Sequence, residues 1–256
     1  MQPYILSETN WKTVKDTEYQ LAILPWGSTE AHNYHLPYST DNILSYRIAE
    51  ESARIAWDCG AKVIVLPTVP YGVNTGQPDV KLDMNLNPST QLAILKDLIT
   101  VLDRQGIHKL VIINGHGGND FKQIIRELDL LFPDMFICQC HWFKIPGREK
   151  FFQDLGEHAG EDETSLMQYL SSDLTLPLTS AGDGRARKFS ISAFGEGWVW
   201  AERRWSEVTK DTGIGNPSLA NEEKGKVFFQ FVTEKIGAFL FELATALPEE
   251  IYKDPD

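Results

Sequence analysis

The sequence predicts an α/β fold, in which a largely parallel β-sheet lies between layers of helices. Two observations predict this fold class: four short apolar runs lack polar alternation, and segments with helical spacing separate them. A strand covered on both faces is apolar throughout, because neither face meets water. Strands that alternate with helices are joined by right-handed crossovers, which make them parallel. No internal repeat or low-complexity linker divides the chain, so we expect one domain over residues 1–256.

The apolar runs are the expected strands. Each is rich in Ile, Val, Leu or Phe, and in chain order they are Leu21–Pro25, Val63–Pro67, Leu110–Ile113 and Met135–Cys140. Their lengths are typical of strands rather than of helices.

Helices are expected between these strands and after the last one. Capping residues place the first start at Thr40-Asp41, the second at Ser89 or Thr90, and the third at Asn119. The C-terminal half is less regular. It is predicted to contain a short helix at Thr164–Leu170, long loops over residues 180–216, and a final helix from about Leu219.

The composition excludes several classes of protein. Of 256 residues, 24 are basic and 36 acidic, which gives a net charge of −12. This charge argues against binding to nucleic acid or to a membrane surface, since both require a concentrated basic face. No stretch approaches the ~20 apolar residues that span a bilayer, and the N-terminus does not resemble a secretion signal. Three cysteines are too few for a disulfide scaffold, so a cytoplasmic location is expected.

The densest group of chemically reactive side chains follows the first expected strand, in Gly27–Asp41. It contains Glu30, His32, His35 and Asp41. In an extended segment Glu30 and His32 point the same way, and carboxylate and imidazole groups bind Zn, Mn or Fe. In open parallel sheets, ligands bind beyond the carboxyl ends of the strands, where this segment lies. The alternative is a polar loop with two surface histidines.

Another histidine, His116, follows the third expected strand in the segment Asn114–Asn119. Its flanking glycines let the backbone come close to a bound group. A phosphate-binding turn is the alternative. The segment matches neither the Rossmann nor the P-loop pattern, so a histidine beside a metal fits it better.

The third cluster, Glu157–Ser165, places His158 among Glu157, Asp162 and Glu163. The acids could serve only to favour the start of the next helix. Beside a histidine they could also supply a metal ligand and a proton carrier. Three clusters of this kind in one chain favour a site with two metal ions.

These segments resemble the signatures of the creatininase (creatinine amidohydrolase) family. Gly27–Asp41 is similar to G-S-x-E-x-H-x-x-H-L-P-x-x-T-D, Asn114–Asn119 to N-G-H-x-x-N, and His158–Ser165 to H-A-G-x-x-E-T-S, in the same order. Gly213–Lys226 resembles the glycine-rich entry to the family's last helix. The resemblance covers roughly residues 20–240. It implies a three-layer α/β/α, creatininase-like domain with a mostly parallel central sheet.

The resemblance also implies a dinuclear metal site. Glu30 and His116 would hold one metal, His32 would hold the second, and Asp41 would bridge the two. The family's further ligand, a Glu two residues after the histidine of N-G-H, is absent here because Gly118 stands at that position. Other branches use the Glu of E-T-S, which makes Glu163 the candidate. The implied cofactors are two divalent ions, Zn first and Mn or Fe as alternatives.

The same resemblance assigns the proton chemistry and part of the pocket. His158 matches the family's catalytic histidine, and Glu157 or Asp162 could orient it, because a histidine base usually needs a partner that fixes its tautomer. The candidates for substrate binding are Asn74, Gly117 and Trp198. The segment around Asn74 departs from the family pattern, which argues against assuming creatinine as the substrate.

The expected function is hydrolysis of a cyclic or other non-peptide amide C–N bond, as in creatinine or a formamide. A hydroxide formed on the two ions would attack the carbonyl carbon, and His158 would give a proton to the departing nitrogen. Two alternatives stay open: a metal-dependent peptidase or maturation enzyme of the same family, and a member that binds metal without catalysis. The expected partners are a small-molecule substrate and, by resemblance, further copies of the chain in a homo-oligomer, often a hexamer.

Overall fold

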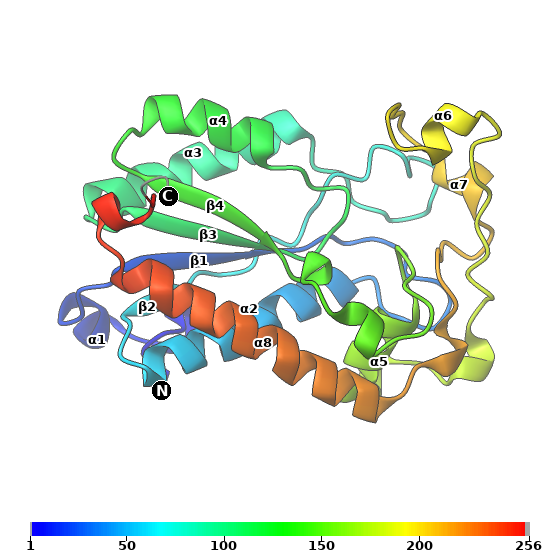
Figure 1. The fold of residues 1–256 in the computed structure, drawn as a ribbon, viewed down its shortest axis with the longest axis horizontal. Coiled ribbons are helices and arrows are strands. Elements are labelled where there is room, and N and C mark those ends of the chain that lie inside the picture. Colours follow the sequence, from blue (N-terminus) through cyan, green and yellow to red (C-terminus); the bar gives the residue numbers. More distant parts are fainter. Residues whose placement is uncertain (1, 254–256) are drawn as a thin grey trace.

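The computed structural model describes residues 2–253, in which helices and strands alternate along the chain (Figure 1). The strands are β1 (Leu21–Trp26), β2 (Val63–Val65), β3 (Lys109–Asn114) and β4 (Phe136–His141). They form one sheet in the order β2-β1-β3-β4, and every neighbouring pair is parallel. The predicted strands and the predicted α/β fold class are therefore confirmed.

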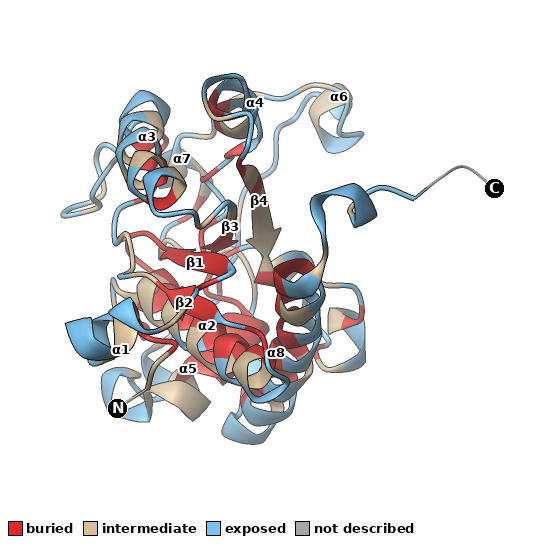
Figure 2. Cartoon of the chain, turned by 90° about the vertical axis from the view of Figure 1, so that its left-hand side faces the viewer, coloured by how far each residue is buried: buried red, intermediate tan, exposed pale blue. Residues whose placement is uncertain are grey.

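Two helical layers cover this sheet (Figures 1 and 2). One layer contains α2 (Thr40–Asp58), α5 (Glu161–Leu170) and α8 (Glu222–Thr245), and the other contains α3 (Pro88–Arg104) and α4 (Lys122–Leu131).

Side chains of β1 alternate between the two apolar cores, as a period of two requires. Leu21 and Ile23 pack with α2, α5 and α8, whereas Ala22, Leu24 and Trp26 pack with α3 and α4. All six residues of β1 are buried, which explains why the strand is apolar throughout.

The starts of four helices differ from those predicted, and one of them is α5, which begins at Glu161 instead of Thr164. Helix α3 begins at Pro88, because proline suits the first helical position, so Ser89 and Thr90 are inside the helix rather than caps. Helix α4 begins at Lys122 instead of Asn119, whose side chain accepts from Gln91 of α3 and donates to the Gly27 carbonyl. Helix α8 begins at Glu222 and not near Leu219, because the Asn221 side chain caps it by accepting from the Lys224 N–H.

The remaining helices are short. The structure adds α1 (Trp11–Lys15), which the sequence did not suggest, and two helices of four residues each, α6 (Ser192–Gly195) and α7 (Trp205–Val208). Apart from α6 and α7, the long loops predicted over residues 180–216 are confirmed. Every helix in the described part of the chain is too short or too polar to pass through a bilayer.

The strand order creates the position at which a site can form. From β1 the chain crosses to β2 on one side, whereas β3 and β4 lie on the other. The last residues of β1 and β3, Trp26 and Asn114, are paired, and the Gly115 N–H donates to the Trp26 carbonyl at 2.8 Å. The two segments that leave these strands therefore begin side by side. Ligands of open parallel sheets bind at such a point.

Candidate functional site

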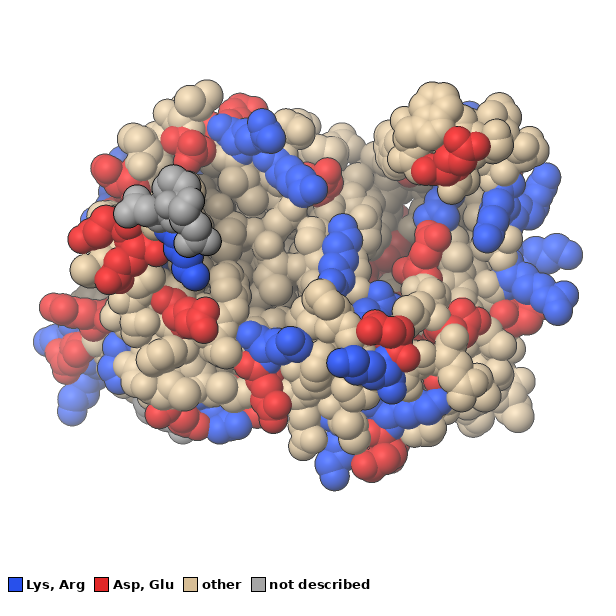
Figure 3. Space-filling model, viewed as in Figure 1, with Lys and Arg blue, Asp and Glu red and all other residues tan. Residues whose placement is uncertain are grey.

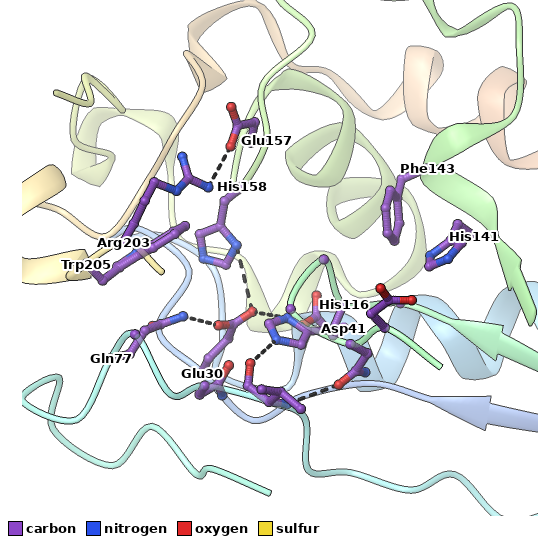
Figure 4. A pocket seen from close by; sticks show the side chains of 18 of the residues that line it. Glu30, Asp41, Gln77, His116, His141, Phe143, Glu157, His158, Arg203 and Trp205 are labelled. Carbon is purple, nitrogen blue, oxygen red and sulfur yellow. Dashed lines mark hydrogen bonds and ion pairs between the residues drawn. The ribbon is translucent and has the colours of Figure 1, made fainter. Parts of the chain in front are cut away.

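Three loops meet beyond the carboxyl ends of β1 and β3, around a cavity of about 600 Å³ (Figure 4). Residues 27–39 follow β1, residues 115–121 follow β3, and residues 157–160 precede α5. In Figure 3 the surface is hollowed between α4 and the segment that carries α6, on the side where Lys122 and residues 200–203 line the cavity. Lys and Arg are interspersed with Asp and Glu on this face, without a concentrated basic patch.

Glu30, Asp41 and His116 form the first group that could hold a metal ion. The Nδ1 atom of His116 lies 2.7 Å from Glu30 Oε1 and 3.2 Å from Asp41 Oδ2. Each residue offers one ligand atom, and these atoms lie within 4.8 Å of one another. All three residues are buried.

The second such group shares Asp41 with the first and adds His32 and Glu163. Here the other carboxylate oxygen, Asp41 Oδ1, lies 3.1 Å from His32 Nε2. Asp41 therefore directs one oxygen to each group. Asp41 stands in the first turn of α2, immediately after the loop that carries Glu30 and His32.

Hydrogen bonds to backbone carbonyls fix the orientation of both imidazoles. His32 bonds through Nδ1 to the Glu30 carbonyl at 3.1 Å, and His116 bonds through Nε2 to the Val73 carbonyl at 3.0 Å. In each ring the other nitrogen is left to face the carboxylates. Histidines that bind metals are commonly held in this way. Gln77 adds a further restraint, since its Nε2 donates to Glu30 Oε2 at 2.6 Å.

The electrostatics of the cluster fit a cation. Burial alone would raise the pKa of Asp41, but His32 and His116 outweigh it and hold that pKa well below its ordinary value. Burial raises the pKa of Glu163 to about 8, although His32 opposes the shift and Asp41 adds to it. Three buried acidic side chains, Glu30, Asp41 and Glu163, thus converge with the imidazoles of this cluster. Glu30 Oε1 and Asp41 Oδ2 are buried and accept no aligned hydrogen bond, as expected of oxygens that would bind a metal ion.

Comparison with known proteins identifies the family of the chain. Residues 7–240 match the model of the family described as creatininase, creatinine amidohydrolase. The chain belongs to the creatininase family. The predicted resemblance is therefore confirmed, and as a member of this family the chain is a hydrolase.

Two curated relatives have different activities. The creatinine amidohydrolase of Pseudomonas putida is 28% identical over 199 residues, which cover 66% of this chain and 72% of the relative. A mycofactocin precursor peptide peptidase of Mycobacterium tuberculosis is 26% identical over 220 residues, which cover 81% and 79%. The curated relatives of the chain thus include both an amidohydrolase and a peptidase.

Solved structures share the fold. A Bacteroides fragilis protein proposed to be a creatinine amidohydrolase is 39% identical, with a TM-score of 0.92 over 97% of this chain and 99% of its own. A creatininase variant of Zn–Zn type is 22% identical, with a TM-score of 0.76 over 96% and 100%, and a creatininase in a manganese form gives 0.74 at 23% identity over 95% and 99%.

His158 lies against both groups that could hold a metal ion. Its Nε2 bonds to the Ala31 carbonyl at 2.8 Å, and its Nδ1 lies 3.8 Å from Glu30 Oε1. Its ring packs on His32, with 4.0 Å between the centroids. Burial and the neighbouring His32 lower the pKa of His158 to about 4. The imidazole is therefore neutral near pH 7, with an unprotonated Nδ1 that can accept a proton.

The structure corrects the predicted partners of His158. Glu157 points to solvent and pairs with Arg203 at 2.8 Å, and Asp162 lies in the first turn of α5, where it pairs with Arg148. Because both carboxylates are held by arginines, neither orients His158. The Ala31 carbonyl does so instead.

Of the three predicted substrate-binding residues, two line the cavity. Asn74 and Gly117 are in the wall, whereas Trp198 is 71% exposed, bonds to Glu196 and lies outside the lining. The tryptophan beside His158 is Trp205, whose ring meets the His158 ring edge to face at 5.5 Å. Nothing in its sequence neighbourhood indicates this position.

His35 contributes to the architecture of the site rather than to either metal group. Its Nε2 lies 2.9 Å from the Thr164 hydroxyl and so ties the loop after β1 to helix α5. Of the four reactive side chains in that loop, His35 is the one outside the groups that could hold a metal.

The space around Gly118 leaves no room for a side chain at this position. A Cβ atom there would lie 2.3 Å from the Val73 carbonyl oxygen and 2.4 Å from His116 Nε2, between the two partners of one hydrogen bond. A Cβ at Gly117, by contrast, meets nothing within 4 Å. We therefore expect Gly118→Ala to destabilise the protein by about 1–3 kcal/mol and to weaken metal binding, because His116 loses its orientation.

This prediction can be checked by denaturant unfolding with chelator present and by zinc titration. Gly117→Ala is the matched control and should behave as the wild type in both measurements. Equal stability and equal zinc affinity of the two variants would contradict the role given to Gly118.

Proposed function

We propose that the protein is an amidohydrolase that binds two divalent cations and cleaves a cyclic or other non-peptide amide C–N bond. The observation that carries this proposal is the position of Asp41, whose two oxygens face separate groups of possible metal ligands. Glu30 and His116 would complete one cation site, and His32 and Glu163 the other. Zn is the first candidate, with Mn or Fe as alternatives, since all three accept carboxylate and imidazole ligands.

When bound, two such cations make a water molecule acidic enough to attack a carbonyl carbon near neutral pH and polarise the carbonyl oxygen. The residues of the chain supply the rest. His158 Nδ1 faces Glu30 and is unprotonated near pH 7, so it can take a proton at the cavity. It can then return that proton to the leaving nitrogen, the step without which amides resist cleavage.

The walls of the cavity restrict the substrate. A cavity of about 600 Å³ exceeds what a small cyclic amide needs and suits a ligand of drug-like size. Trp205 offers an aromatic face beside His158, and Gly117 and Asn74 offer backbone and amide groups on other walls. We therefore propose a small-molecule amide larger than creatinine.

A second candidate is a metal-dependent peptidase or maturation enzyme. The volume of the cavity favours it, because a short peptide would fit, and the peptidase of M. tuberculosis is a relative. A third reading, a metal-binding protein without catalysis, is disfavoured because the groups of possible metal ligands include the whole expected set, Glu30, His32, Asp41, His116 and His158.

The decisive experiment combines metal analysis with a substrate screen. The purified protein should contain about two equivalents of Zn, Mn or Fe per chain and should hydrolyse a member of a panel of cyclic amides, formamides and short peptides. Activity on amides alone supports the first candidate, and activity on peptides alone supports the second. Full activity in metal-depleted protein would refute both.

We also propose that the protein is a homo-oligomer, with a hexamer as the first expectation. Large apolar side chains are exposed in residues 189–205, including Ile191 at 61% and Trp200 at 80%. Exposed apolar groups of this size commonly mark a contact with another chain. Light scattering coupled to size-exclusion chromatography measures the mass directly, and a monomer at micromolar concentration would refute this proposal.

A further inference from the structure

A carboxylate outside the cavity lining contacts the segment that carries Glu30 and His32. Asp83 is distant in sequence, in the loop between β2 and α3, and its Oδ1 accepts the Ala31 N–H at 2.7 Å. It belongs to none of the groups of possible metal ligands in residues 2–253. The usual reasons for a buried carboxylate oxygen at such a site, metal binding or contact with substrate, therefore do not explain it.

The backbone around Asp83 is held in place from both sides. The Met84 N–H donates to the Thr29 carbonyl at 2.9 Å, and the Tyr38 hydroxyl donates to the Lys81 carbonyl at 2.8 Å. Between them Leu82 adopts a φ of +65°, a left-handed conformation that leucine rarely takes, with a side chain that is 64% exposed. Such a conformation persists only where its surroundings enforce it. Here it directs Asp83 toward Ala31.

Ala31 connects Asp83 to the proton-carrying histidine. Its N–H is held by Asp83, and its carbonyl accepts from His158 Nε2 at 2.8 Å. The two groups lie on either side of one α-carbon, so fixing the first restrains the direction of the second. A hydrogen on Nε2 leaves Nδ1 of His158 as the unprotonated nitrogen, directed toward Glu30 at 3.8 Å.

We propose that Asp83 is a positioning residue for His158: it holds the Ala31 backbone so that the Ala31 carbonyl selects the Nε2–H tautomer of the histidine. The proposal concerns a hydrogen bond rather than a charge. Its consequence for turnover rests on the proposed amidohydrolase function, whereas its consequence for the tautomer of His158 does not.

The test compares Asp83→Ala with Asp83→Asn, which keeps an oxygen that can accept the Ala31 N–H. Asp83→Ala should lower kcat by roughly 10–100-fold, the usual effect of removing a group that orients a reactive residue. KM should change by less than about threefold, because Asp83 does not line the cavity. Asp83→Asn should restore most of kcat, and the metal content of both variants should equal that of the wild type.

The tautomer is measured independently of activity by 15N NMR at neutral pH, in which protonated and unprotonated imidazole nitrogens have separate shifts. The wild type should show His158 with a protonated Nε2, and Asp83→Ala should show a mixture of tautomers. Asp79→Ala is the control, since Asp79 is exposed on the same loop and bonds to Ser206. If Asp83→Ala fails to fold, Asp83→Ser replaces it in the comparison with Asp83→Asn, because the serine side chain is too short to reach the Ala31 N–H.

Three results would overturn the proposal: an unchanged kcat in Asp83→Ala, an unchanged tautomer in that variant, or an Asp83→Asn variant as impaired as Asp83→Ala. If the wild type hydrolyses no substrate, the proposed function fails, but the NMR comparison still decides the role of Asp83.

Discussion

Replacing Asp41 with alanine is expected to remove both metal binding and turnover. Each Asp41 oxygen lies near a different histidine, at 3.1 Å from His32 Nε2 and 3.2 Å from His116 Nδ1. Loss of the carboxylate would therefore take one ligand from each of the two proposed cation sites at once. Removing a group that only orients a metal ligand lowers metal affinity or activity about 10–100-fold. Loss of the shared ligand itself should therefore lower kcat/KM by at least roughly 10³-fold.

Metal analysis after gel filtration and a kinetic assay measure this effect. Asp58→Ala is the matched control, because Asp58 ends the same helix and forms an exposed ion pair with Arg54. That variant should keep its metal and its activity, since an exposed ion pair contributes less than about 1 kcal/mol to stability. An Asp41→Ala protein with two metal equivalents per chain would show that Asp41 does not bridge.

Replacing His158 with alanine is expected to keep the metal and lose most of the activity. His158 is neutral near pH 7 because burial and His32 lower its pKa to about 4, and its Nδ1 faces the carboxylates. A positioned general acid–base contributes about 10²–10⁴-fold to the rate. We expect kcat to fall by that factor while the metal content stays at the wild-type value.

Metal content is the measurement that separates this role from metal binding. His158 also lies with Glu30 and His32 in a third group that could hold an ion. If His158→Ala lost one equivalent of metal, the histidine would be a ligand rather than a proton carrier. His108→Ala serves as the control, since the side chain of His108 is 50% exposed and belongs to no such group in the described residues.

The elements of the fold could be predicted because they depend on local pattern. A strand such as β3 is apolar throughout wherever it lies in the chain, and a helix such as α8 repeats its apolar residues every three or four positions. Helix starts were less certain. At α3 the choice depended on proline at the first position, which outweighed the nearby Ser and Thr.

The candidate metal ligands could also be predicted, for a topological reason. Glu30, Asp41 and His116 follow strands that proved to be adjacent, and the carboxyl ends of parallel neighbours lie at one edge of the sheet. Their residue types then limited the chemistry. The choice of Glu163 as a candidate ligand depended on resemblance, and the structure places its carboxylate close to His32 and Asp41.

Contacts between side chains distant in the sequence could not be predicted from residue type and local spacing. Glu157 and Asp162 stand beside His158 in the chain, yet Arg203 and Arg148 hold them away from it. Trp205 rather than Trp198 packs against His158, and the Trp205 backbone N–H donates to the carbonyl of Gly76 in a distant loop at 2.9 Å.

The sequence alone predicted the parallel sheet, its helical layers and a set of carboxylates and imidazoles suited to two cations. It could do so because residue type and short-range spacing encode each of these features. Only the tertiary structure decided which atom faces which. In that structure His158 bonds to a backbone carbonyl, and Asp83 accepts from the Ala31 N–H, 52 positions away in the sequence. Each oxygen of Asp41 lies near a different histidine. Side-chain direction in loops is set by hydrogen bonds that close over long stretches of chain, and no local spacing specifies them.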